Sequence, residues 1–414
     1  MRNLTALSVF LACGSCFCQL AGFPGDFSEQ AFQHVEKLCS FGQRGSDAKA
    51  RAETVDYLSA EFRKLGLETA IEPFTYKSFE SKTIKLMAGG KEYKAVRFFI
   101  NPYAPDSIKG SALFLDKDSS LKKVYENNLT DRIALMTQAV NRYQLMARKP
   151  RALVVVADSI YQRLDRSDDS KVEISAAGTI VLQKSANIIG VLGPERGNEI
   201  IISAHWDSFD GPGASDNASG VGVMLELANY FSSTKPGCTI RFVSFGAEEL
   251  GCLGAKAYAI RHKNELKKCT MAFNIDEVGG YKDVYIEMRG GVRDLPKENE
   301  FDFDVTRANL AITDSHHGWF LTNSGMSASN VPDWLTKAID ESCRELKIEY
   351  IPANEMGSDH QVLFQSGVVA TNICCYGDNK THCPEDLPDQ VNKTGLEKAG
   401  KIVALTVEKA MNHK

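Results

Sequence analysis

Four apolar runs in the second half of the chain are separated by segments with the periodicity of amphipathic helices. The runs cover residues 199–204, 238–246, 271–275 and 367–376. The helical patterns cover residues 218–232, 251–265 and 390–412. Strands that alternate with helices are typical of a mostly parallel, doubly wound sheet flanked by helices, so the sequence predicts an α/β fold.

Ionisable residues stand next to these predicted strands. Three of them, His205, Glu249 and Asp276, follow strand ends, where open α/β sheets place their ligands. A globular fold has no structural need for so many charges there, because an unpaired buried charge is costly. The ligand-type residues in this setting are His205, Asp216, Glu249, Asp276 and His360. Histidines and carboxylates are suitable zinc ligands, and two cations about 3.5–4 Å apart can activate a water for hydrolysis.

The carboxylates in this set suit particular roles. Glu248 and Glu249 are neighbours and project in different directions, so one can bind a metal while the other transfers a proton. Asp216 has two carboxylate oxygens and can therefore span two ions. Asp207 lies two residues after His205 on the same strand face, from which it can accept the second imidazole N–H and fix the tautomer.

Each motif has an ordinary structural explanation when it is taken alone. A His-x-Asp pair is commonly structural, a Glu-Glu pair suits a helix start, and SDNASG at 215–220 is typical of a turn and N-cap. Their combination favours metal binding. We interpret the other histidines as structural or exposed, although the loops around His316, His317 and His382 could approach the site. The remaining three, expected to be exposed, are His34, His262 and His413.

The ordered motifs HWDS, SDNASG, AEELG, NIDEVG and SDH resemble peptidase family M28, the co-catalytic zinc aminopeptidases. The resemblance covers roughly residues 27–76 and 187–410 and includes FGQRGS at 41–46. It implies a zinc exopeptidase-like fold with two Zn²⁺ ions per chain. One ion would be held by His205 and Asp276, the other by Glu249 and His360, with Asp216 bridging them. The resemblance also implies that Glu248 is the general base and that Asp207 orients His205.

Length and charge limit the other possibilities. A chain of 414 residues allows two domains but not many, and a net charge of −5 gives no basic surface for nucleic acid. After residue 25, no apolar run approaches the ~20 residues of a transmembrane helix. Arg2 precedes an apolar stretch over 4–17 that is followed by small residues, a pattern that predicts a signal peptide over 1–18. A lipid anchor and a buried N-terminal helix are the alternatives.

Export from the cytoplasm would have consequences for the cysteines. A secreted or periplasmic protein folds in an oxidising compartment, where disulfides are stable. Cys375 and Cys383 flank a short loop and are the expected pair. Among the eight cysteines that follow the predicted signal peptide, no Cys-x-x-Cys zinc motif is present.

Residues 77–186 have a pattern of their own, with short apolar strands at 109–118, 131–140 and 147–159 around a helical stretch. This pattern resembles, in abbreviated form, the protease-associated domain inserted in several M28 relatives. A plain α/β insertion that extends the sheet is the alternative. We therefore expect a zinc peptidase domain over 19–76 plus 187–414, interrupted by a smaller α/β domain at 77–186.

These observations predict a secreted zinc-dependent exopeptidase that acts on peptides, most simply an aminopeptidase that removes N-terminal residues. A dipeptidase or carboxypeptidase of the same family is one alternative. A glutaminyl cyclase, which works with one zinc, is another, and metal-free scaffold relatives form a third class. The complete set of ligand-type residues favours hydrolysis. The sequence leaves side-chain specificity and oligomeric state open.

Overall fold

The computed structural model describes most of the chain. The described residues are 22–94, 97–98, 107–115, 129, 132–137, 151–167, 170–194, 198–209, 211–288, 331–353, 357–375, 381–382 and 384–412. The predicted signal peptide and the residues His316, His317, Cys383 and His413 lie outside them. Among the described helices, none combines the length and apolarity needed to span a bilayer.

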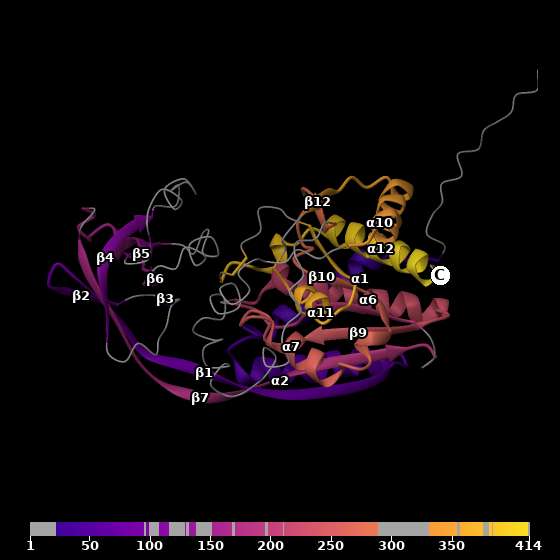
Figure 1. The fold of residues 1–414 in the computed structure, drawn as a ribbon, viewed down its shortest axis with the longest axis horizontal. Helices are drawn as coiled ribbons and strands as arrows, with labels where there is room; N and C mark the ends of the chain where they lie inside the picture. The colour runs from indigo at the N-terminus through magenta and orange to yellow at the C-terminus, as the bar shows by residue number, and fades with distance from the viewer. Residues whose placement is uncertain are drawn as a thin grey trace, which may run out of the picture.

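The chain forms a main domain of a sheet covered by helices and a small domain at the far end of a long two-stranded ribbon (Figure 1). The strands of the main domain that follow the ribbon are β8 (Glu199–His205), β9 (Thr239–Phe245), β10 (Cys269–Ile275), β11 (Val284–Glu287), β12 (Ile351–Ala353) and β13 (Ala370–Cys375). Their order across the sheet is β12-β11-β13-β10-β8-β9, and β9 then pairs with the ribbon strand β7 (Lys171–Leu192).

The central strands are parallel, as the sequence predicts. β9 pairs with β8, β8 with β10, and β10 with β13, all in parallel register. The flanking pairs β7–β9 and β11–β13 are antiparallel, so the sheet is mixed at its edges. Because the carboxyl ends of parallel strands meet at one edge, residues that follow β8, β9 and β10 are brought together there.

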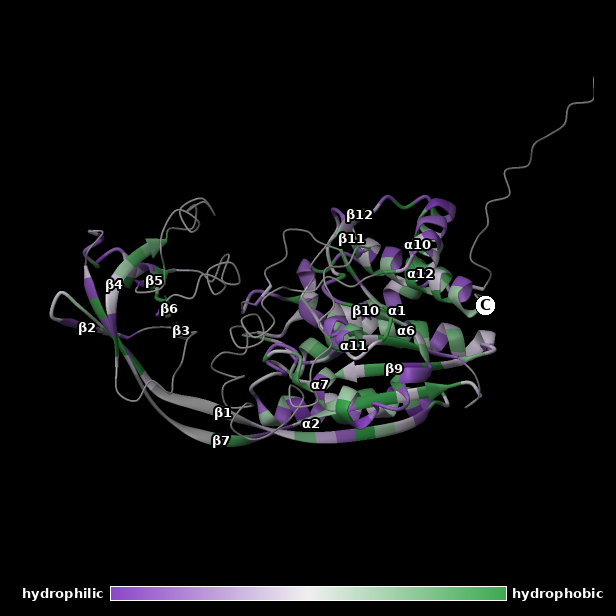
Figure 2. Ribbon diagram, in the orientation of Figure 1, coloured by the Kyte–Doolittle hydropathy of each residue, from purple (hydrophilic) through white to green (hydrophobic). Residues whose placement is uncertain are grey.

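Helices cover both faces of this sheet. They are α1 (Phe27–Cys39), α2 (Ala48–Lys64), α6 (Ser219–Thr234), α7 (Leu253–Arg261), α10 (Asp333–Leu346), α11 (His360–Gln365) and α12 (Lys393–Met411). Side chains alternate along β8: Ile200 and Ile202 join the core with α1, α6 and α12, whereas Ile201 joins the core with α7 and α11. This alternation confirms the doubly wound arrangement. Figure 2 shows hydrophobic residues in the central strands and hydrophilic residues on the outer helix α10.

The ribbon runs from one domain to the other, with one register shift in its first strand between Ser81 and Thr83. β1 (Glu68–Ala88) pairs antiparallel with β7 along almost its whole length, from Glu68 opposite Val191 to Ala88 opposite Val172. The predicted domain boundaries, at 76/77 and 186/187, therefore fall inside two continuous strands (Figure 1).

The small domain has a hydrophobic core of its own, which includes Leu86, Ile133 and Ile174. Its elements are β2 (Lys91–Lys94), β3 (Arg97–Phe98), β4 (Ile108–Leu115), β5 (Arg132–Met136), β6 (Ala152–Val155) and the short helix α5 (Asp158–Tyr161). β4, β5 and β6 are parallel neighbours, and β4 also pairs with β7, so this sheet continues from the ribbon.

Candidate metal centre

Buried ionisable side chains gather at the edge where the central strands end. His205 is the last residue of β8, Glu249 follows β9 by four residues, and Asp276 follows β10 directly. Their exposed fractions are only 1%, 2% and 7%. Asp216 joins them from the segment that precedes α6 and is likewise buried. Four of the five predicted ligands therefore lie together.

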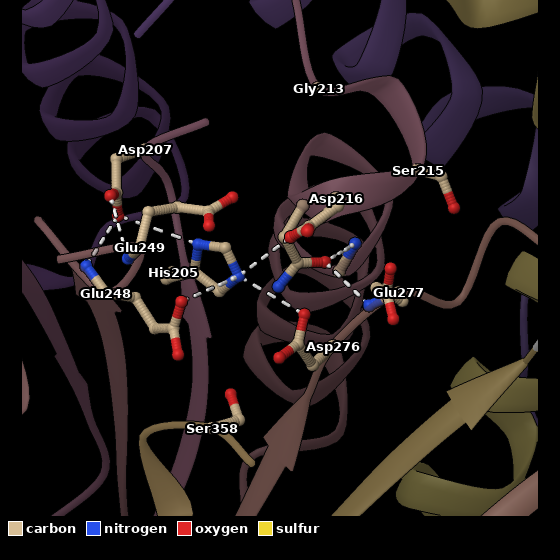
Figure 3. Close-up of polar contacts among 12 residues, drawn as sticks. His205, Asp207, Gly213, Ser215, Asp216, Glu248, Glu249, Asp276, Glu277 and Ser358 are labelled. Atoms are coloured by element: carbon tan, nitrogen blue, oxygen red, sulfur yellow. Dashed lines mark hydrogen bonds and ion pairs between the residues drawn. The ribbon is translucent and has the colours of Figure 1, made fainter. Parts of the chain in front are cut away.

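The first donor group is centred on the imidazole of His205. Its Nε2 lies 3.1 Å from Oδ1 of Asp216 and 3.2 Å from Oδ1 of Asp276 (Figure 3). One ligand atom from each of the three residues falls within 4.8 Å of the others. Such a cluster can enclose a single cation.

The second donor group uses the other oxygen of Asp216. Nε2 of His382 lies 2.8 Å from Oδ2 of Asp216 and 3.0 Å from Oε2 of Glu249. Burial opposes ionisation of Asp216, but His382 and His205 together lower the pKa of this carboxyl group. The two oxygens of Asp216 are thus divided between the groups, in the arrangement that a bridging carboxylate requires.

The predicted role of His360 is contradicted by its placement. His360 lies in the first turn of α11, and its Nε2 is 2.8 Å from Oε2 of Glu287 on β11. Both side chains are fully buried, and among the described residues His360 belongs to neither donor group. His382 occupies the position in the second group that the sequence analysis gave to His360.

The sequence analysis named His382 only as a residue that could approach the site. A signal was present nonetheless: His382 follows the end of β13, which is parallel to β10 and ends at the same edge of the sheet. The expectation that His34 and His262 are exposed is wrong. His34 pairs with Glu226 and His262 with Glu72, and both histidine side chains are only 14% exposed.

Glu248 lies beside the first donor group. Its Oε2 is 3.9 Å from Nε2 of His205, the nitrogen on which that group is centred. Burial raises the pKa of Glu248 well above its usual value; the positive charge of His205 opposes this, and the negative charges of Asp359 and Asp276 add to it. A carboxylate with a raised pKa at the edge of a metal site is suited to accept a proton.

Asp207 supports the two glutamates through their backbone. Its Oδ1 accepts a hydrogen bond from the Glu248 N–H at 2.9 Å, and its Oδ2 accepts one from the Glu249 N–H at 3.2 Å (Figure 3). The distance from Asp207 Oδ1 to Nδ1 of His205 is 3.6 Å, which is an ion-pair separation rather than a hydrogen bond. Asp207 therefore links the end of β8 to the Glu-Glu pair.

Arg44 of the FGQRGS motif holds the loop between His205 and Asp216. Its guanidinium is buried and donates to the carbonyl groups of Trp206 at 2.7 Å and Gly213 at 3.0 Å, and also to that of Pro212. The N-terminal motif thus acts on the site through the backbone of a loop.

Asp386 holds the bridging residue from the other side. Its two carboxylate oxygens accept hydrogen bonds from the N–H groups of Ser215 at 2.8 Å and Asp216 at 3.1 Å. Burial raises the pKa of Asp386 to about 6. The sequence predicts no role for Arg44 or Asp386, and both hold the backbone of the segment that leads to Asp216.

Asn217 is also internal. Its side-chain amide donates to the Ile275 carbonyl at 2.8 Å, and its side-chain oxygen accepts from the N–H groups of Gly220 and Glu277. Asn217 therefore has a structural role, although it begins an Asn-x-Ser sequon.

The expected disulfide is not formed. Cys375 is a free, buried thiol that lies 3.7 Å from the Gly395 carbonyl, which contradicts the expected bridge to Cys383. Burial raises the pKa of Cys375 to about 12.

The donor set fits divalent cations. Oε1 of Glu249 is buried and has no hydrogen-bond partner among the described residues. Burial, followed by the charge of Asp216, raises the pKa of Glu249 to about 6, although His382 and His205 act in the opposite direction. Imidazole nitrogens and carboxylate oxygens are the donors that zinc takes in catalytic sites. Within the part of the chain that the structure describes, two such three-residue groups share Asp216.

The sequence profile described as Peptidase family M28 matches residues 187–407, more than half of the chain. This chain belongs to peptidase family M28. The matched range contains every donor named above.

The names of similar proteins agree with this assignment. The aminopeptidase YwaD of Bacillus subtilis (strain 168) is 31% identical over 242 residues, which cover 55% of this chain and 45% of that protein. A probable zinc metalloprotease of Pyrenophora teres f. teres (strain 0-1) is 39% identical over 110 residues, or 23% of this chain and 24% of that protein. The chain thus spans less than half the length of these curated relatives.

Solved structures share the fold. The aminopeptidase from Aneurinibacillus sp. strain AM-1 superposes with a TM-score of 0.64 at 20% identity, and the match covers 92% of this chain and 93% of that one. The zinc aminopeptidase BSAP from Bacillus subtilis superposes with a TM-score of 0.62 at 19% identity, covering 92% and 94%. At these identities the similarity establishes the α/β architecture alone.

Proposed function

We propose that this M28 chain is a zinc-dependent aminopeptidase that removes N-terminal residues with two Zn²⁺ ions. The single observation that carries the proposal is the division of the Asp216 carboxylate between two buried donor groups. One group contains His205 and Asp276, and the other contains Glu249 and His382. The names of the similar proteins, aminopeptidase and zinc metalloprotease, support the same activity.

Zinc bound in these groups would supply Lewis-acid polarisation of the scissile carbonyl and would lower the pKa of a nearby water. The residues of the chain do the rest. Glu248 takes the proton of the attacking water, because its Oε2 faces the donor groups and its raised pKa favours protonation. The same carboxyl group then delivers that proton to the departing amine. Asp207 holds the backbone of both glutamates so that one binds metal while its neighbour moves the proton.

Export is part of the proposal. The pattern at residues 1–18 predicts a signal peptide, and the proposed enzyme would act on peptides in a secreted or periplasmic location. A lipid-anchored form is the less favoured variant of this proposal.

The substrate end is tested with a peptide panel. Purified full-length protein, with zinc and then with a chelator, is incubated with a free peptide, its N-acetylated form and a peptide that begins with Gln. The proposal expects stepwise loss of N-terminal residues from the free peptide only, abolished by the chelator and by Glu248→Gln. Cleavage of the acetylated peptide at its C-terminus would indicate a carboxypeptidase. Cyclisation of the Gln peptide alone would indicate a glutaminyl cyclase, and the absence of any turnover would indicate a scaffold. Each of these three outcomes contradicts the proposal.

A further inference from the structure

The two carboxylate oxygens of Glu248 lie in different surroundings. Oε2 is 3.9 Å from Nε2 of His205 and faces the donor groups. Oε1 lies 3.5 Å from the sulfur of Cys252 and accepts a hydrogen bond from its thiol. Oε2 therefore lies on the side of the donor groups, whereas Oε1 is held by the thiol of Cys252.

Cys252 reaches Glu248 because the chain turns back on itself immediately after the two glutamates. The N–H groups of Gly251 and Cys252 both donate to the Glu248 carbonyl, at 2.7 and 2.8 Å. Cys252 has a left-handed backbone conformation, with φ of 57°, that non-glycine residues adopt uncommonly. The side chain is 1% exposed and precedes the first turn of α7. The turn thus fixes the thiol of Cys252 beside the carboxylate of Glu248.

The thiol is the hydrogen-bond donor of this pair. Burial, followed by the negative charges of Glu248 and Asp359, raises the pKa of Cys252 well above its usual value. A sulfur that keeps its proton can donate to a carboxylate, although S–H is a weak donor. An apolar side chain at this position would leave Oε1 of Glu248 without that donor, and an unpaired buried acceptor is costly.

We propose that Cys252 is a positioning residue for the general base. Its S–H holds Oε1 of Glu248, which keeps Oε2 directed toward the water between the donor groups. The inference rests on the proposed function, in which Glu248 transfers the proton. It goes beyond that function by assigning a role to a cysteine that belongs to neither donor group.

The alternative is that Cys252 only fills space, since it also belongs to the hydrophobic core with Phe245 and Tyr258. Serine and alanine separate the two roles, because their side chains are similar in size and only serine has a donor. In zinc-loaded protein, Cys252→Ala should lower kcat about three- to tenfold, the loss expected for one weak hydrogen bond, with unchanged KM and zinc content. Cys252→Ser should restore most of kcat. Equal kcat values for the two variants would overturn the inference.

A spectroscopic readout tests the contact without any substrate. The S–H stretching band of Cys252 is isolated as the infrared difference between wild-type protein and Cys252→Ser, in which the other thiols cancel. The inference expects this band at lower frequency than that of a free thiol. In a Glu248→Gln background it should move to higher frequency, because an amide oxygen is a weaker acceptor than a carboxylate. A band that does not move would overturn the inference.

The two readouts also separate this inference from the proposed function. If the band moves as expected in the Glu248→Gln background but wild-type protein has no aminopeptidase activity, the proposed function fails and the positioning role of Cys252 fails with it. If wild-type protein is active and Glu248→Gln is inactive while the band does not move, the function stands and the positioning role is wrong.

Discussion

His382 is the residue on which the second donor group depends. It contacts Asp216 and Glu249 directly, whereas His360 is engaged with Glu287. We expect His382→Ala to bind only one zinc with high affinity. Loss of a group that merely supports a metal ligand lowers affinity by about 10- to 100-fold, and the affinity of His382→Ala for the other zinc should fall by more than that. His360→Gln is the matched control and should keep both ions. Titration of metal-free protein with zinc measures both variants, and loss of an ion in His360→Gln alone would restore the original assignment.

Glu248 and Glu249 are adjacent but should respond differently to the same substitution. Glu248→Gln should keep its zinc and lose about 10²–10⁴-fold in kcat, because glutamine cannot accept the proton. Glu249→Gln should lower zinc occupancy as well, because Glu249 belongs to the second donor group. Parallel measurement of kcat and bound zinc decides the assignment. If Glu248→Gln loses metal while Glu249→Gln retains it, the two roles are reversed.

At this scale, residues next to a strand end were predictable and residues in loops were not. His205, Glu249 and Asp276 were predicted because an apolar run ends beside each of them. His382 follows its strand by seven positions, so no periodic pattern ties it to the sheet. No role for Cys252 is predicted from the sequence. Its contact with Glu248 depends on a left-handed backbone conformation that cannot be predicted from the sequence pattern.

At the scale of elements, the segment before α6 is held in place by Asp386. Its two oxygens accept the N–H groups of Ser215 and Asp216, and asparagine can accept only one of them while presenting an N–H to the other. We expect Asp386→Asn to weaken zinc binding by about 10- to 100-fold. Asp389→Asn, an exposed change of the same chemistry, is the control and should leave zinc affinity unaltered. Equal affinities of the two variants would show that the segment needs no such support.

The elements of the main domain were largely predictable, because each strand is a short apolar run and each helix has one apolar face. The four predicted strands and three predicted helices correspond to β8, β9, β10, β13, α6, α7 and α12. The ribbon was not predicted. β1 has 21 residues and extends beyond the hydrophobic core of the main domain. Its pattern of apolar and polar residues therefore changes where the chain passes from one domain to the other. A domain boundary placed at a change of pattern therefore falls inside the strand.

For the whole molecule, the metal-free protein should lose stability as pH rises. Burial chiefly raises the pKa of Glu249 and Asp386 to about 6 and that of Glu277 to about 8, from usual values of 4.5, 3.8 and 4.5. The folded state therefore binds protons that the unfolded chain has released, so stability falls between about pH 4 and pH 8. The pKa of His205 is also raised, which acts in the same direction, and Asp216 titrates below this window.

Thermal unfolding of metal-free and zinc-loaded protein at pH 5 and pH 8 measures this effect. We expect a lower Tm for metal-free protein at pH 8 and a larger stabilisation by zinc there, since ligands must be deprotonated to bind. At zinc concentrations of 1,000 Kd the stabilisation should reach about 4 kcal/mol. Glu277→Gln should flatten the slope between pH 6 and pH 8. A metal-free Tm that rises over this range would contradict the buried carboxylate account.

The most direct test of the central claim is the number and position of metal ions in crystals of the zinc-loaded protein, located by anomalous scattering at the zinc edge. The account predicts two peaks per chain on either side of the Asp216 carboxylate. One peak should be bounded by His205 and Asp276, and the other by Glu249 and His382. A single peak, no peak, or a second peak bound to His360 at full occupancy would contradict it.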